Sequence, residues 1–164
     1  MIRILGVDPG GSGALALLDG TKLVDVVDMP VFQVARGKGF KPEIDTHALI
    51  ALLHAWKPDA CWFERVGGMD GQSASAAFNF GRVAGNCEAL VKASGARFDF
   101  VSPHVWKGGM KLINAAKDDA RAKATNIWPH MAERFRRKMD DGRAEAALIA
   151  EYGRREFVTQ GIFG

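Results

Sequence analysis

The chain has 164 residues, of which 48% are hydrophobic and 25% charged, and its net charge is +3. This composition predicts one globular domain over residues 1–164, large enough to bury a core without disulfides or a structural metal. Because no apolar run approaches the roughly 20 residues that span a bilayer, a membrane partner is excluded, and we expect a cytoplasmic protein.

The first 28 residues predict three short strands joined by tight turns. The apolar runs are Ile2–Val7, Ala14–Leu18 and Leu23–Val27, with glycine-containing turns between them. Such runs indicate an antiparallel meander. Residues Met29–Pro42 contain glycines and basic residues without apolar periodicity, which predicts a loop.

The rest of the chain alternates helices with two further strands. Asp45 or Thr46 begins a helix that ends at Lys57-Pro58, and Ala60–Phe63 reads as a buried strand. A glycine-rich loop, a helix from Ser73 to about Ser94 and a strand over residues 98–101 follow, and then helical segments over residues 117–128, 131–138 and 141–152, with Gly153 as the stop. This order predicts an α/β fold with one mixed five-stranded sheet flanked by helices.

Acidic residues stand at the ends of these elements. Asp8 ends the first strand, Glu64 ends the fourth, and Asp141 with Glu145 opens the last helix. An ionised carboxylate beside a buried strand is costly unless it is paired or binds a metal. Each acid alone could instead cap a turn or pair with a basic side chain, but their joint position favours a metal site.

Asp140 and Asp141 compete for one place in this site. Asp141 and Glu145 are four residues apart and share one helix face, whereas Asp140 lies about 140° round from Glu145. Asp141 is therefore the preferred ligand, although it could be the N-cap and leave Asp140 to reach the metal.

A cluster of oxygen ligands of this kind suits Mg²⁺, with Mn²⁺ as a substitute. Two such ions in one active site could activate a water molecule and stabilise the leaving oxygen in phosphodiester hydrolysis. The sequence therefore predicts Asp8, Glu64, Asp141 and Glu145 as catalytic carboxylates.

Positive charge is concentrated in one segment. Residues 103–138 contain nine Lys or Arg and three acidic residues, so the rest of the chain is net negative. This distribution suits a polyanion held beside a metal site, although it also suits a solvated helical face. We expect Lys111, Lys117 and Arg121 to contact a DNA backbone.

Several short motifs resemble those of RuvC-type Holliday-junction resolvases, particularly the phage-type branch. They are Ile4–Gly10, Trp62–Val66 and Asp140–Ala150, together with a helix over Ser73–Leu90 that carries Phe78, Phe80, Gly81, Arg82 and Gly85. The resemblance covers most of the chain in the same order. One departure is that many bacterial members place the last two acids three residues apart and end on Asp, whereas here the spacing is four and the last acid is Glu145.

The resemblance implies a ribonuclease-H-like fold and a magnesium-dependent endonuclease that resolves four-way DNA junctions by paired nicks. It also implies a homodimer, with the helix of Gly81 and Gly85 near the interface, and a basic residue, here Lys107, near the scissile phosphate. Gln72, Ser73, Phe78 and Arg82 form a second candidate DNA surface, where an aromatic ring could stack on an unpaired base. Phe78 and Phe80 could equally belong to the core.

Three other functions are compatible with parts of the sequence. A ribonuclease-H-like nuclease could act on forks, flaps or RNA hybrids instead of four-way junctions. The segment from Val7 to Gly13 also resembles the phosphate loop of actin-like and sugar-kinase ATPases, but those proteins have two such lobes and lack the late acidic pair. A non-catalytic DNA-binding module would be expected to lack the acids that this chain retains.

Overall fold

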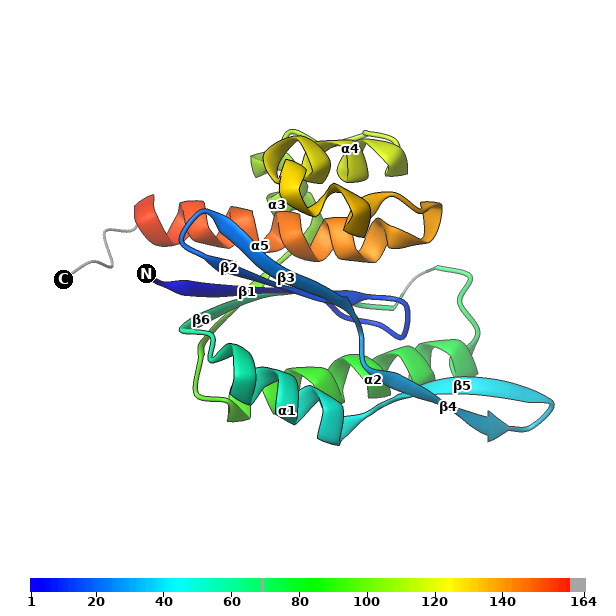
Figure 1. Cartoon of the computed structure of the whole chain (residues 1–164). Coiled ribbons are helices and arrows are strands. Elements are labelled where there is room, and N and C mark those ends of the chain that lie inside the picture. Colours follow the sequence, from blue (N-terminus) through cyan, green and yellow to red (C-terminus); the bar gives the residue numbers. More distant parts are fainter. Residues whose placement is uncertain (69, 160–164) are drawn as a thin grey trace.

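A mixed five-stranded sheet forms the centre of the molecule, with helices on both faces (Figure 1). The computed structural model describes residues 1–68 and 70–159. In the order β3-β2-β1-β6-β7 the strands are Lys22–Asp28, Ala14–Asp19, Arg3–Asp8, Ala60–Glu64 and Arg97–Val101. β1, β2 and β3 are antiparallel, whereas β6 and β7 run parallel to β1. The predicted α/β fold with a mixed five-stranded sheet is confirmed.

The two faces of the sheet bury separate hydrophobic clusters. Helices α1 (Thr46–Trp56) and α2 (Ala74–Ala93) pack on one face, over Leu5, Val7 and Phe63. Helix α5 (Asp141–Thr159) packs on the other face, with α3 (Pro103–Gly109) and α4 (Lys117–Ile127) beyond it (Figure 1). Strand alternation sends neighbouring residues of β1 into opposite clusters, which is why these strands are apolar on both faces.

Helix α5 lies unusually close to β1. A Cβ atom on Gly6 would be 2.2 Å from the backbone oxygen of Ala146 and 2.8 Å from the side chain of Ala150. Only a glycine on the strand and alanines on the helix allow this approach. The contact places the N-terminal turns of α5 beside the end of β1.

The predicted loop over residues 29–42 is wrong, because this segment forms a β-hairpin. Strands β4 (Val31–Arg36) and β5 (Gly39–Ile44) pair antiparallel, and Gly37 in the turn has φ 59°, in the left-handed region. The hairpin is mostly exposed, so it lacks the apolar alternation by which a half-buried strand is recognised. It projects from the molecule beside α2 (Figure 1).

Two helical predictions also need correction. Helix α5 runs through Gly153 to Thr159, because Gly153 packs against Trp62 and does not end the helix. The segment predicted as a helix over residues 131–138 forms two 3₁₀ turns, Pro129–Phe135 and Lys138–Asp140. By contrast, Asp45 and Ser73 cap α1 and α2 as their sequence positions predict.

Cys61 and Cys87 are free and buried. Burial raises the pKa of the Cys87 thiol to about 12, so this thiol is neutral at physiological pH. Within the described residues, no helix combines the length and the apolar character needed to cross a bilayer.

Candidate active site

Three carboxylates from distant parts of the chain converge at one end of the sheet. Asp8 is the last residue of β1 and Glu64 the last of β6. Because these strands are parallel neighbours with Val7 opposite Phe63, their C-terminal ends meet at the same edge. Glu145 comes from the first turns of α5, whose Gly142 backbone lies against the Asp8 carboxylate.

The electrostatics of Asp8 reflect this convergence. Burial raises the pKa of Asp8 well above its ordinary value, and the nearby charges of Glu64 and Glu145 raise it further, against an opposing effect of Lys107. No hydrogen bond or ion pair reaches the Asp8 carboxylate from within residues 1–68 and 70–159. Negative charge is thus gathered here without direct compensation at Asp8.

Glu64 belongs to the same electrostatic group. Burial is the main reason why the pKa of Glu64 is raised, and Glu145 adds to it, whereas the hydrogen bond from Trp106 and the charge of Lys107 act in the opposite direction. The side chain is only 9% exposed. A cation bound beside Glu64 would stabilise the ionised form of this carboxylate.

Helix α3 supplies the two side chains that face these carboxylates. Ser102 caps the helix, and Pro103 occupies its first turn. Trp106, which is fully buried, donates its indole N–H to Oε1 of Glu64 at 2.7 Å. The ammonium group of Lys107 lies 3.2 Å from Oε1 of Glu145. Lys107, which the resemblance predicts near a scissile phosphate, thus lies beside Glu145. Sequence reasoning did not find Trp106, since only tertiary structure reveals its contact with Glu64.

The carboxylates at this site are better suited to binding a divalent cation than to forming structural ion pairs. Within the described residues, no three carboxylate, imidazole or thiol groups already stand at the separations of a closed cation cage. Asp8, Glu64 and Glu145 nevertheless repel one another around a buried point, and they offer the hard oxygen donors that Mg²⁺ and Mn²⁺ prefer. Lys107 is the positive group that partly balances them.

Asp141, the preferred predicted ligand, and Asp140, its alternative, both lie beside arginines. The buried carboxylate of Asp140 accepts hydrogen bonds from the Arg137 side chain at 2.7 and 3.0 Å, and Arg143 lies 3.6 Å away. Burial opposes its ionisation, but these partners lower the pKa of Asp140 overall. Oδ1 of Asp141 lies 2.9 Å from Nε of Arg121. Neither Asp140 nor Asp141 is among the residues that raise the pKa of Asp8. The geometry therefore does not support the preference for Asp141 over Asp140.

The predicted backbone-contacting residues differ in their surroundings. Lys111 is exposed in a turn after α3, with φ 57°. Arg121 is only 13% exposed and lies between Asp118 and Asp141, so it is a structural residue in this conformation. Lys117 begins α4, but its side chain lies outside what the structure describes.

The second candidate DNA surface lies at the start of α2. Ser73 uses its hydroxyl to accept the backbone N–H of Ala76, which is a capping role. Phe78 is 64% exposed and does not belong to the core, and the guanidinium of Arg82 lies 5.9 Å from its ring centre. Phe80 is partly buried and packs against Gly10, in the turn after Asp8. Gln72 lines a pocket of about 180 Å³ together with Val66, Gly67, Gly68, Ala77, Phe80 and Gly81.

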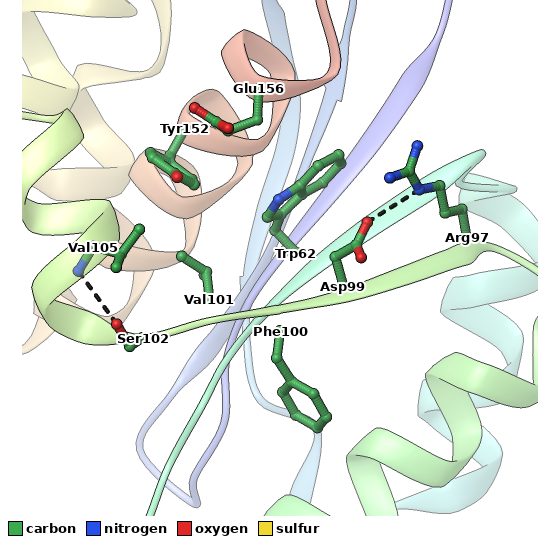
Figure 2. Close-up of a pocket in the computed structure, with 9 residues that line it drawn as sticks. All are labelled: Trp62, Arg97, Asp99, Phe100, Val101, Ser102, Val105, Tyr152 and Glu156. Carbon is green, nitrogen blue, oxygen red and sulfur yellow. Dashed lines mark hydrogen bonds and ion pairs between the residues drawn. The ribbon is translucent and has the colours of Figure 1, made fainter. Parts of the chain in front are cut away.

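A separate pocket of about 240 Å³ lies between the edge strand β7 and the C-terminal half of α5, and Figure 2 shows the residues that line it. Arg97 and Asp99 form an ion pair at its rim, and Trp62, Tyr152 and Glu156 line its other side. None of the predicted catalytic residues lines it. This pocket is therefore distinct from the carboxylate site.

Comparisons with known proteins find similar structures but no similar sequences. No protein-family model matches the chain, and no curated protein sequence matches it significantly. The T. thermophilus RuvC in complex with Holliday junction substrate has 16% sequence identity and a TM-score of 0.64, over 98% of this chain and 97% of that one. A further Thermus thermophilus RuvC structure gives 16% identity, a TM-score of 0.59 and the same coverage.

The yeast mitochondrial Holliday junction resolvase Ydc2 has 12% identity and a TM-score of 0.51, over 99% of this chain and 83% of that one. These likenesses extend over nearly the whole chain. They establish that the chain has the fold of RuvC, as the sequence motifs predicted.

Proposed function

We propose that this protein is a metal-dependent endonuclease that resolves four-way DNA junctions by phosphodiester hydrolysis. The observation that carries the proposal is the convergence of Asp8, Glu64 and Glu145 at one end of the sheet, with Lys107 beside them. A fold shared with two resolvases supports the choice of substrate. We propose branched DNA as the partner.

Asp8, Glu64 and Glu145 would hold divalent cations, Mg²⁺ or Mn²⁺, with two ions in each active site. When bound, such ions supply an activated water molecule and stabilise the leaving oxygen. Trp106 positions Glu64 through its indole N–H, which leaves Oε2 of that carboxylate available. Lys107, whose ammonium group lies beside Glu145, would stabilise the negative charge that develops on the phosphate.

Contacts outside this centre would hold the DNA without reading its sequence. We propose Lys111 and Lys117 for backbone contacts, and Phe78 with Arg82 at the start of α2 for contacts near the branch point. We also propose a homodimer, because two symmetric nicks require two active sites. The exposed side of α2 around Gly81 and Gly85 would form the interface.

A phosphotransferase of the actin-like or sugar-kinase type is the less favoured alternative. Such a function needs the turn after β1 to present its backbone to a nucleotide phosphate. In this chain Phe80 and Pro42 cover Gly10 and Gly11, since Cβ atoms there would be 3.1 and 2.4 Å from those side chains. The turn is therefore occupied by the protein's own side chains.

The proposed function predicts that loss of a converging carboxylate abolishes cleavage. Asp8→Asn and Glu145→Gln should each lower the cleavage rate of a four-way junction by more than about a hundredfold, because fewer charges remain to hold the metal. Binding to the junction in EDTA should stay within about threefold of wild type. Asp141→Asn is the matched control, since Arg121 holds that carboxylate, and it should cost less than about tenfold.

Cleavage is measured with four-way, forked and linear DNA and with an RNA–DNA hybrid, with Mg²⁺ and with EDTA. If the protein cuts a fork or a hybrid faster than the four-way junction, that nucleic acid replaces the junction as the proposed substrate. If Asp8→Asn cut at the wild-type rate, or if Asp141→Asn were as inactive as Glu145→Gln, the proposed ligand set would be wrong.

A further inference from the structure

The β4–β5 hairpin has one face that leads from the hydrophobic core into open solvent. Strand pairing places Val31 with Ile44, Gln33 with Pro42, and Ala35 with Phe40 on this face. Ile44 is only 4% exposed and belongs to the core, whereas Phe40 at the far end is 70% exposed. Pro42 lies in the middle of this face, opposite Gln33.

Pro42 ties this face to the turn that follows Asp8. A Cβ atom on Gly11 would lie 2.4 Å from the Pro42 ring, so the strand and the turn are in close contact. Phe40 follows two residues away on the same face, which is about 7 Å along the strand. The exposed ring is therefore one step along the strand from the contact with the turn that follows Asp8.

The hairpin also carries the charge that suits a polyanion. Arg36, Lys38 and Lys41 outnumber its one acid, Glu43, which is paired with Arg36 and lies 3.5 Å from Arg82 of α2. These ion pairs join the hairpin to α2. Within residues 1–68 and 70–159 no acid pairs with Lys38, which lies in the turn two residues before Phe40, or with Lys41, which strand alternation places on the opposite face with Phe32. An exposed aromatic ring beside a basic side chain is the combination that binds unpaired nucleotides.

We propose that the β4–β5 hairpin is a second DNA contact in which Phe40 stacks on an unpaired base near the branch point while Lys38, in the turn beside it, holds an adjoining phosphate. This inference rests on the proposed function and names how the branched character of the substrate is sensed. Phe32 serves as the internal comparison, because it is 49% exposed on the opposite face of the same hairpin.

The test compares Phe40→Ala and Phe32→Ala in binding to a four-way junction that carries 2-aminopurine at the branch point, in EDTA so that no cleavage occurs. Phe40→Ala should weaken junction binding by about five- to hundredfold and abolish the fluorescence change of the base. Binding to linear duplex should stay within about twofold. Phe32→Ala should behave as wild type in both assays.

A second variant tests the charge independently of the ring. Lys38→Ala should reduce the dependence of log K on log salt by about 0.9, which is the contribution of one phosphate contact. Thermal unfolding and sedimentation of all the variants check folding and assembly, because a second copy of the chain is the rival occupant of this face.

Equal effects of Phe40→Ala and Phe32→Ala, or an unchanged salt slope, would overturn the hairpin contact. So would a Phe40→Ala variant that binds the junction normally but no longer assembles as wild type does. If wild type cuts junctions and Phe40→Ala is unaffected, only the hairpin contact fails. If wild type neither binds nor cuts any branched DNA, the proposed function fails with it.

Discussion

Trp106 shows how a residue without charge controls a charged site. It is fully buried on α3, and its indole N–H is the donor that counteracts the effect of burial on the pKa of Glu64. A hydrogen bond to the ionised form of a carboxylate stabilises that form. The proposed role of Glu64 as a metal ligand thus depends on a residue 42 positions away in the chain.

Trp106→Phe is predicted to raise the pKa of Glu64 further, because the aromatic packing is kept and only the donor is removed. The low-pH limb of the pH–rate profile should move to higher pH, so that activity at pH 6 falls more than activity at pH 8. Trp128→Phe is the matched control, since that buried indole donates to the backbone oxygen of Thr21, away from the carboxylates. Both variants should lose about 1 kcal/mol of stability. An identical pH profile for the two variants would remove Trp106 from the role assigned to it.

At the scale of elements, small residues fix the position of α5 and therefore of Glu145. Gly6 allows the helix to lie on β1, and Gly153 allows it to lie on Trp62, where a Cβ atom would be 2.3 Å from the indole ring. Side chains at these positions would push the helix away from the sheet. The position of Glu145 near the start of α5 therefore depends on packing along the whole length of the helix.

Gly153→Ala and Gly85→Ala test this packing as a pair, because both glycines lie inside helices. Alanine favours a helix by up to about 1 kcal/mol over glycine. At Gly85, where no atom of the same chain lies within 4 Å of the added Cβ, this gain should appear as higher stability of the separated monomer. At Gly153 the clash with Trp62 should outweigh it and lower the free energy of unfolding by about 1–3 kcal/mol. Chemical denaturation measures both, and equal stabilisation would show that α5 is free to shift.

For the whole molecule, the carboxylate cluster should make stability depend on pH in an unusual direction. In the folded state the pKa values of Asp8 and Glu64 are raised above the values of 3.8 and 4.5 of the unfolded chain. The folded state therefore binds protons more tightly at these two groups, and their contribution to stability falls as pH rises from about 4 through the raised pKa values. At neutral pH the ionised cluster is destabilising.

Asp8→Asn is accordingly predicted to melt at a higher temperature than wild type at pH 8 without metal, and the difference should shrink toward pH 4. Mg²⁺ should reverse the order, because binding at a hundred times its Kd stabilises wild type by about 2.7 kcal/mol and the variant by much less. Melting curves across pH with Mg²⁺ or EDTA measure this. A wild-type protein whose melting temperature ignores Mg²⁺ at pH 8 would argue against a metal at this cluster.

Assembly is the second property of the whole molecule that can be tested. The exposed side of α2 carries Gly81 and Gly85, whose open surroundings would let a second helix approach closely. Gly81→Arg should convert a dimer to a monomer in sedimentation experiments, because the added side chain occupies this space. Ala55→Arg, at an exposed position of α1, should leave the dimer intact. A wild-type chain that sediments as a monomer at micromolar concentration would contradict the proposed homodimer.

The sequence by itself determined the features that local patterns encode. Apolar runs predicted the five strands of the sheet, caps predicted the starts of α1 and α2, and the ends of those runs placed Asp8 and Glu64 at element boundaries. For β1, β2 and β6 these predictions succeed because burial on both faces requires apolar residues at nearly every position, whereas the edge strands β3 and β7 are partly exposed. The resemblance of short motifs predicted the fold, and the comparisons with solved structures confirm it.

Only the tertiary structure decided which side chains meet. It brought Glu145 to Asp8 and left Asp140 and Asp141 with arginines, it joined Trp106 to Glu64, and it made a hairpin of a segment without apolar alternation. Pairings of this kind depend on helix placement across the sheet, and that placement is set by contacts such as Gly6 on Ala146, between residues far apart in the chain. The periodicity of apolar residues reflects the surroundings of one element at a time, and therefore it does not reveal contacts between residues far apart in the chain.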